Sequence, residues 1–223
     1  MMDFKADSQL EFVLVGGGGH CRSCINSIIR ADNKVLGIID NDSKGNILDF
    51  PVIGSDKCIS RLVTDNPNAN FIVAVGMIKG TSLLRQKLFE KLLSHNAVKK
   101  SIISKSSAVS PFAKIGLGST ILEGVSINAN AVIGDNTIIN TGAIIEHDSY
   151  IGDHSHISTG AIVNGGVCIG ENCMIGSGSV ILQGIKIVAN TTIAAGSVVT
   201  KDITVAGTWI GTPAKRKDEQ NVE

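Results

Sequence analysis

An aliphatic residue recurs at every sixth position through the second half of the chain, with no insertion. A period of six matches neither an α-helix, with 3.6 residues per turn, nor a simple strand, which alternates every two residues. It is typical of a solenoid whose coils have three flat sides of six residues each. The members of the series are Val109, Ile115, Ile121, Ile127, Ile133, Ile139, Ile145, Ile151, Ile157, Val163, Ile169, Ile175, Ile181, Ile187, Ile193, Val199 and Val205.

A second series of mostly small side chains follows the aliphatic one by four residues and begins with Ala113, Ser119 and Val125. We expect the aliphatic side chains to stack on one another inside a triangular prism and the small ones to fill its corners. Gly, Asn and Asp near the corners supply backbone conformations with positive φ. The 25 glycines and the aromatic content of only 4% fit this expectation, because large rings do not fit a narrow prism.

Composition and charge exclude several classes of protein. The chain has 20 basic and 20 acidic residues, so it lacks the basic excess that is typical of proteins binding nucleic acid or an anionic membrane. We find no apolar run long enough to span a bilayer and no signal-peptide pattern, and we expect a cytoplasmic protein. The five cysteines are scattered, which argues against a disulfide framework. The pair Cys21 and Cys24 has the spacing of a redox or metal pair, but we favour two buried helix residues.

Residues 11–100 show alternating strand and helix signals, which favour a small parallel α/β domain. The first strand ends in a turn of four glycines, Gly16 to Gly19, followed by His20. The expected strands cover 11–15, 35–39, 52–54 and 71–75, and the expected helices cover 21–31, 55–63 and 81–95.

A glycine turn between a strand and a helix is a place where phosphates bind, because bare N–H groups and the helix N-terminus favour an anion. The strands before Asp40 and Gly76 end at the same edge of the expected sheet as this turn. The sequence therefore predicts a nucleotide across Gly17, Gly18, Asp40 and Gly76, with Asp40 or Asn41 binding a polar group. A turn with only a structural role remains the alternative.

Three of the five histidines, His147, His154 and His156, fall within ten residues of one another in the repeat region. None replaces an aliphatic residue of the ladder, so we expect all three to point outward. A histidine beside a carboxylate can act as a general base near neutral pH. Glu146 and Asp148 flank His147. A zinc site made by the three histidines and a solvated loop are the alternatives.

Hexads such as Ile115-Gly-Leu-Gly-Ser-Thr and Ile175-Gly-Ser-Gly-Ser-Val resemble those of the hexapeptide-repeat acyltransferases. Together with the strand, glycine turn and His20 near the N-terminus, they resemble the sugar acetyltransferases of bacterial glycan synthesis. That family includes N-acetyltransferases of nucleotide-linked 4-amino-4,6-dideoxy sugars and sialic-acid O-acetyltransferases. The resemblance implies a Rossmann-like α/β domain at 1–100 and a left-handed parallel β-helix at 101–223. It also implies acetyl-CoA as co-substrate, no metal, and a homotrimer.

The resemblance also implies a role for each candidate residue. His147 would be the general base, Asp148 or Glu146 would orient it, and His156 would contact the acetyl group. A backbone N–H near Gly165 would stabilise the oxyanion. The nucleotide sugar would be held by Gly17, Gly18, His20, Asp40, Asn41 and Gly76, and acetyl-CoA by His156, Gly165, Gly178, Ala195 and Lys215, partly from an adjacent subunit. Transfer to a hydroxyl of a sialic-acid-type acceptor, or a non-catalytic trimer that binds nucleotide sugars, remain alternatives.

Overall fold

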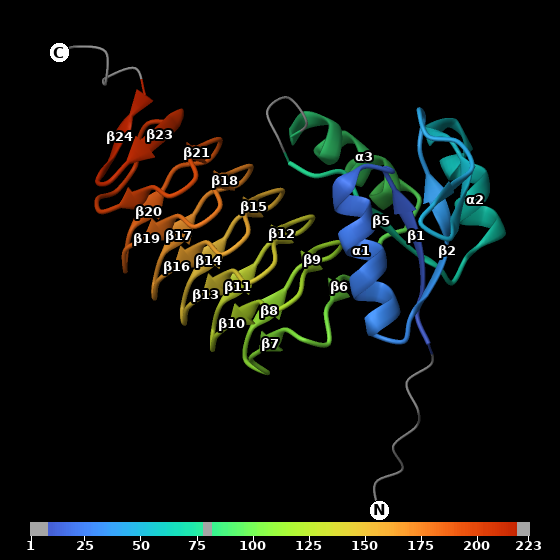
Figure 1. The fold of residues 1–223 in the computed structure, drawn as a ribbon, viewed down its shortest axis with the longest axis horizontal. Helices are drawn as coiled ribbons and strands as arrows, with labels where there is room; N and C mark the ends of the chain where they lie inside the picture. The colour runs from blue at the N-terminus through green and yellow to red at the C-terminus, as the bar shows by residue number, and fades with distance from the viewer. Residues whose placement is uncertain (1–8, 78–81, 218–223) are drawn as a thin grey trace, which may run out of the picture.

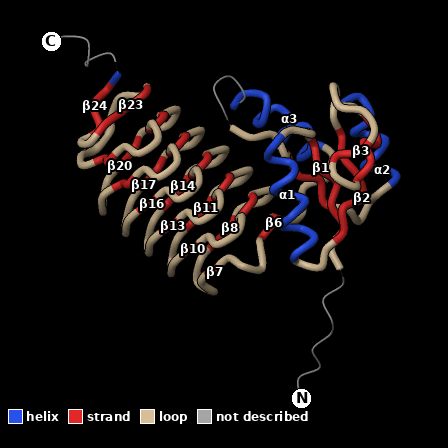
Figure 2. The backbone as a smooth tube through the Cα atoms, in the orientation of Figure 1, coloured by secondary structure: helices blue, strands red, loops and turns tan. Residues whose placement is uncertain are grey.

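The computed structural model describes residues 9–77 and 82–217. A small α/β part comes first and packs against the opening coils of a long triangular prism, which ends in a C-terminal hairpin (Figure 1). The two parts differ plainly in their elements: helices occur only in the first, among the described residues, and the second is made of short strands and tight turns (Figure 2).

The α/β part has a five-stranded sheet in the order β3-β4-β2-β1-β5. Strands β1, β2, β4 and β5 run parallel, and β3 pairs antiparallel with β4 at one edge. The expected parallel α/β arrangement is therefore confirmed, with an antiparallel edge strand in addition. The strands are β1 (Glu11–Val15), β2 (Lys34–Ile39), β3 (Asn46–Ile47), β4 (Phe50–Gly54) and β5 (Asn70–Val73).

Helices cover both faces of this sheet, because successive side chains of a strand point to opposite sides. Phe12 and Leu14 of β1 pack with α1, whereas Val13 and Val15 pack with α2 and α3. The helices are α1 (Gly19–Arg30), a short 3-10 turn (Asp56–Cys58), α2 (Ile59–Asp65) and α3 (Ser82–Ser94).

The prism has three faces, and each is a ladder of parallel strands in which partners are 18 residues apart, except at the C-terminal end of the third face. Face 1 contains β7 (Ala108–Val109), β10 (Ser126–Ile127), β13 (Ile144–Ile145), β16 (Ile162–Val163), β19 (Val180–Ile181) and β22 (Val198–Val199). Face 2 contains β8 (Lys114–Ile115), β11 (Val132–Ile133), β14 (Tyr150–Ile151), β17 (Cys168–Ile169) and β20 (Lys186–Ile187). Face 3 contains β6 (Ile102–Ile103), β9 (Thr120–Ile121), β12 (Ile138–Ile139), β15 (His156–Ile157), β18 (Met174–Ile175), β21 (Thr192–Ile193), β23 (Thr208–Gly211) and β24 (Ala214–Arg216).

The six-residue period produces this left-handed β-helix in the way that the sequence predicts. The aliphatic series forms one continuous buried core along the prism axis, from Ile121 to Val199. From Ile115 to Ile193, the residue three positions after each aliphatic one has a positive φ. Glycine and asparagine fill most of these positions, but Asp148 (φ 58°) and His154 (φ 59°) fill two of them. Both exceptions lie in the histidine-rich coil.

The predicted ladder is wrong at its C-terminal end. Val205 is 50% exposed, and Ile203 instead forms the bridge to Ile187. The last coil is therefore two residues shorter than the period requires, and Asp202 accepts a hydrogen bond from the Lys186 N–H at 2.8 Å. Strand pairing also begins one hexad before the predicted start of the series, because Ile103 pairs with Ile121, although Ile103 itself is 43% exposed.

The α/β part is fixed to face 3 of the prism. Ser27 of α1 donates a hydrogen bond to the Glu123 carboxylate at 2.8 Å, and Asn26 donates another at 2.8 Å. Ile102 of β6 belongs to the same buried cluster as the α1 side chains. No helix in the described ranges is long and apolar enough to cross a membrane.

Candidate functional site

His147 and Asp148 form a hydrogen-bonded pair at the corner between face 1 and face 2. His147 Nδ1 lies 2.7 Å from Asp148 Oδ2. The hydrogen bond from His147, and then one from Asn130, hold the pKa of the Asp148 carboxyl below its usual value. An ionised carboxylate on Nδ1 favours the tautomer that carries its proton there, so Nε2 is left as the proton acceptor.

Gly165 lies one coil above His147. Because Gly165 has no side chain, the His147 ring can pack directly over it. A Cβ at Gly165 would lie 2.7 Å from His147 Nε2 and 2.8 Å from Cε1. The ring borders an open cleft of about 490 Å³ that is also lined by Glu146, Asn164 and Gln183. Within the described residues, the Gly165 N–H has no hydrogen-bond partner. The cleft thus combines an imidazole, a carboxylate, two amides and a backbone donor.

Glu146, the other acid considered for orienting the base, bonds elsewhere. Its Oε2 accepts a hydrogen bond from Asn128 Nδ2 at 2.9 Å. Among the described residues, the only carboxylate bonded to the His147 ring is that of Asp148. Glu146 still lines the cleft beside the base.

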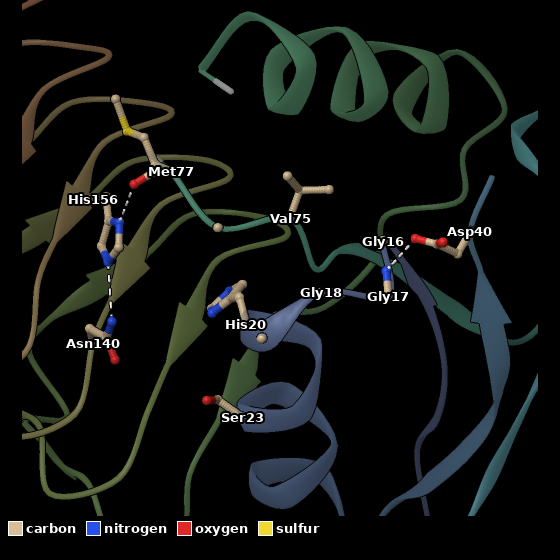
Figure 3. A pocket seen from close by; sticks show the side chains of 12 residues that line it. Gly16, Gly17, Gly18, His20, Ser23, Asp40, Val75, Met77, Asn140 and His156 are labelled. Atoms are coloured by element: carbon tan, nitrogen blue, oxygen red, sulfur yellow. Dashed lines mark hydrogen bonds between the residues drawn. The ribbon is translucent and has the colours of Figure 1, made fainter. Parts of the chain in front are cut away.

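The glycine turn and the prism together line a second pocket, of about 550 Å³ (Figure 3). The N-terminus of α1 opens into it, with Gly18 as N-cap, no side-chain cap and no acidic residue in the first turn. Uncapped N–H groups at a helix N-terminus are typical anion donors. The lining residues are Gly16, Gly17, Gly18, Gly19, His20, Ser23, Asp40, Val75, Gly76, Met77, Asn140 and His156.

Asp40 organises the glycine turn. Its Oδ2 accepts a hydrogen bond from the Gly17 N–H at 2.7 Å, and its Oδ1 accepts from the N–H groups of Asp42 and Ser43. Burial raises the pKa of Asp40, but these donors outweigh burial and lower its pKa overall. A Cβ at Gly17 would lie 2.5 Å from Ile47 Cδ1 and 3.0 Å from the Asp40 carboxyl, so a larger residue would displace one of these side chains.

Asn41 does not join its predicted partners in this pocket. Its side chain is bonded in both directions to Asp56, donating to Oδ2 at 2.9 Å and accepting from the backbone N–H at 3.1 Å. Asn41 and Asp56 instead line an adjoining small cleft, which shares Gly16, Asp40 and Val75 with the pocket.

His156 points from face 3 into the pocket, as Figure 3 shows. Its Nδ1 lies 3.4 Å from the Met77 carbonyl oxygen and its Nε2 lies 3.2 Å from Asn140 Nδ2. Burial, followed by the charge of Arg85, lowers the pKa of His156 to about 4. Burial, followed by Arg85 and His156, lowers the pKa of His20 to about 3. Both imidazoles are therefore neutral near pH 7, and His156 carries its proton on Nδ1, where only an acceptor faces it.

The three clustered histidines do not converge. His154 packs edge-on against Phe89 with the ring centroids 5.7 Å apart, and its Nδ1 lies 3.0 Å from Asn136 Nδ2. The described residues contain no group of three or more His, Cys, Asp or Glu side chains placed to hold a metal ion. The zinc alternative therefore has no support in the described part of the chain. All three histidines point out of the prism core as predicted, but the α/β part covers His154 and His156.

Cys21 and Cys24 are buried in α1 without a disulfide. Burial raises the pKa of Cys21 to about 12 and raises the pKa of Cys24 as well. Reactive and metal-binding thiols need the opposite shift, so the interpretation as buried helix residues fits.

The residues predicted to hold acetyl-CoA are spread over the prism. Gly165 lies beside His147, whereas Gly178 and Ala195 are exposed at the corner between face 3 and face 1. Lys215 is exposed on β24, at the far end of the prism. His156, which is also predicted to contact the acetyl group, lines the glycine-turn pocket, and that pocket shares no lining residue with the His147 cleft.

Sequence reasoning missed Asn140, Met77 and Arg85. Asn140 follows an aliphatic ladder position directly, and no sequence signal sets it apart from the other corner asparagines. Arg85 had a usable signal. It lies on the same helical face as Leu88, Phe89 and Leu92, and all four side chains are buried.

Three family models match the chain. The PglD N-terminal domain matches residues 11–92, the bacterial transferase hexapeptide (six repeats) matches 130–165, and the hexapeptide repeat of succinyl-transferase matches 166–201. Among curated proteins, no sequence matches the chain.

Solved structures match nearly the whole chain. A histidine-to-asparagine mutant of perosamine N-acetyltransferase from Caulobacter crescentus, in complex with CoA and GDP-perosamine, has a TM-score of 0.87 and 35% identity, covering 93% of this chain and 96% of that one. The acetyltransferase domain of PglB from Neisseria gonorrhoeae, in complex with acetyl coenzyme A, has a TM-score of 0.85 and 28% identity, covering 93% and 99%. The chain therefore belongs to the hexapeptide-repeat sugar acetyltransferases, which join a PglD-type N-terminal domain to a left-handed β-helix.

Proposed function

We propose that the protein transfers acetyl from acetyl-CoA to the amine of a nucleotide-linked 4-amino-4,6-dideoxy sugar in bacterial glycan biosynthesis. Residues 1–100 bind the nucleotide sugar and residues 101–223 carry the transfer. The observation that supports this most directly is the His147–Asp148 pair, with an open Nε2, in a cleft of a hexapeptide prism. The matched enzyme bound to CoA and GDP-perosamine supports the same class of substrate.

His147 acts as the general base. The sugar nitrogen attacks the thioester carbonyl carbon, and its proton passes to His147 Nε2 as the C–N bond forms. The C–S bond then breaks, and the leaving thiolate recovers a proton from the imidazolium. Asp148 stabilises the imidazolium through Nδ1, and the unpaired Gly165 N–H stabilises the oxyanion.

The glycine turn binds the diphosphate of the nucleotide. The bare N-terminus of α1 supplies donors at Gly18 and Gly19, and neither position has an atom within 4 Å of where a Cβ would be. His20 and His156 are neutral, so they bring no positive charge to the sugar end of the pocket. Asp40 serves this site indirectly, by fixing the turn through the Gly17 N–H.

We infer a homotrimer, in which the His147 cleft of one copy faces the glycine-turn pocket of another. Within one chain, His147 lies at the corner between face 1 and face 2, whereas His156 lines the glycine-turn pocket from face 3, so the two sites open on different sides of the prism. Face 1 offers an apolar surface for the contact. Its outward column is Ala108, Ser126, Ile144, Ile162, Val180 and Val198, whereas the column on face 2 includes Lys114 and Lys186. Sedimentation should give three times the chain mass, and a monomer with full activity would contradict the trimer.

A panel of acceptors tests the reaction. We would incubate the protein with acetyl-CoA and measure free thiol release with nucleotide-linked 4-amino sugars, the same sugars without the amine, and sialic acid. We expect turnover only where the amine is present. A preference for sialic acid would favour hydroxyl acetylation instead, and no turnover with any acceptor, despite binding of a nucleotide sugar, would favour the non-catalytic alternative.

Replacing Asp148 with asparagine tests the electrostatic part of the mechanism. Asparagine already occupies the equivalent positive-φ corner at positions 130, 136, 172 and 190, so the turn should be preserved. The amide oxygen can still accept from Nδ1, but the negative charge that stabilises the imidazolium is lost. We expect kcat to fall about tenfold or more with little change in either KM. An Asp148→Asn variant with unchanged kcat would remove the carboxylate from the mechanism.

A further inference from the structure

Arg85 is buried without a counter-charge. Its side chain is 1% exposed in α3, and no carboxylate pairs with it among the described residues. Burial lowers the pKa of Arg85 to about 10, so the guanidinium stays charged near pH 7. Its Nε has no hydrogen-bond partner. Burying a cation among neutral groups costs desolvation free energy, which packing alone does not offset. The hydrogen bonds of the guanidinium must therefore hold it in place.

The guanidinium joins the edge of the α/β sheet to the prism. On the sheet side, Nη1 donates to the carbonyl oxygens of Val73, at 3.3 Å, and of Val75. On the prism side, Nη2 donates to the backbone oxygen of Asn136 at 2.8 Å and to its Oδ1 at 2.9 Å. Asn136 is itself a corner residue with positive φ and is fully buried. One side chain thus fixes the end of β5 relative to the prism.

The segment that Arg85 holds forms a wall of the glycine-turn pocket. Val75, Gly76 and Met77 line that pocket. Figure 3 shows Val75 and Met77 across it from the start of α1. The Met77 carbonyl in turn faces His156 Nδ1 at 3.4 Å. Moving Val75 would therefore move both the pocket wall and the acceptor that sets the His156 tautomer.

We propose that Arg85 is a positioning residue for the nucleotide-sugar substrate: it holds the Val75–Met77 wall against the prism and so sets the width of the pocket. This inference rests on the proposed function, in which the nucleotide sugar binds in that pocket. Arg85 itself lies outside the pocket lining and touches no substrate. Its loss should weaken binding of the nucleotide sugar and leave the acetyl-CoA half-site, around His147 and Gly165, unchanged.

The test compares Arg85→Met, Arg85→Lys and the control Lys87→Met, which removes an exposed charge from the same helix. We expect Arg85→Met to raise the KM for the nucleotide sugar about tenfold while the KM for acetyl-CoA stays within about twofold. Arg85→Lys keeps the positive charge but lacks the forked guanidinium that reaches both the end of β5 and Asn136. We therefore expect its KM for the nucleotide sugar to lie between those of the wild type and Arg85→Met. Lys87→Met should match the wild type.

Equal losses in both KM values and in kcat would mark Arg85 as a general structural residue and overturn the proposal, as would an unchanged sugar KM in folded Arg85→Met. If that variant does not fold, Asn136→Gly decides, because glycine tolerates the positive φ and the change removes only the Oδ1 acceptor of Arg85 and the contact with His154. It should raise the sugar KM selectively, and no change would overturn the proposal.

An Asp40→Asn variant distinguishes a failure of the proposed substrate site at the glycine turn from a failure of the proposed role of Arg85. This variant weakens the hydrogen bond to the Gly17 N–H. If the KM for the nucleotide sugar is unchanged, the substrate does not bind at the glycine turn, and the proposed substrate site is wrong. If Asp40→Asn raises the sugar KM and Arg85→Met does not, only the role of Arg85 fails.

Discussion

Replacing His147 with alanine should lower kcat by roughly 10²–10⁴-fold, the usual contribution of a general base. Among the described residues, His147 supplies the only imidazole that lines its cleft, and its Nε2 is the atom left open by the bond to Asp148. The side chain is 64% exposed, so its removal should barely change the melting temperature or the assembly. Thiol release from acetyl-CoA in the presence of the amino sugar measures the loss.

The control is His95→Ala, which removes a histidine that lines neither of the two clefts. It should keep wild-type turnover. The KM of each substrate in His147→Ala distinguishes a loss of catalysis from a loss of binding. Both KM values should change little, because the base acts on the proton in the transition state and not on ground-state binding. Full turnover in His147→Ala would show that the proton leaves by another route, and Glu146, in the same cleft, would be the next candidate.

The prism could be predicted from the sequence because its determinants are local. Each hexad carries its own aliphatic core residue and its own corner residue, so the period alone gives the three faces and their register. The end of the ladder could not be predicted in this way. In the sequence, the six-residue period of aliphatic residues continues from Val199 to Val205. In the structure, the last coil is two residues shorter, and Ile203 is buried instead of Val205. Pairing along the prism, rather than period, decides which residue enters the core.

The candidate site was predictable only in pieces. His147 could be predicted because it is a histidine flanked by two carboxylates. The glycine turn could be predicted because four consecutive glycines follow a strand. The meeting of Asn140 and His156 with that turn depends on how α1 docks on face 3, through contacts such as Ser27 with Glu123, nearly a hundred residues apart. Arg85 escaped notice because arginine is almost never fully buried, although its helical spacing with Leu88 and Leu92 placed it on the inner face.

Replacing Gly165 with alanine should reduce kcat about a hundredfold while leaving the fold intact. Gly165 does not have the positive φ that would make a side chain strained, so the backbone accepts alanine. The added Cβ would meet the His147 ring at 2.7 Å, and the ring is the end of a flexible side chain that can move away. Displacement of Nε2 by about an ångström breaks the geometry of proton transfer without an appreciable cost in the free energy of unfolding.

A double-mutant cycle separates this steric effect from the oxyanion role of Gly165. Alanine keeps the backbone N–H, so Gly165→Ala tests the ring position rather than the donor. In a His147→Ala background no ring remains to be displaced, and Gly165→Ala should then cost nothing further in residual turnover. An equal hundredfold loss in both backgrounds would show that Gly165 acts on acetyl-CoA directly, by leaving room for the thioester, and not through the base.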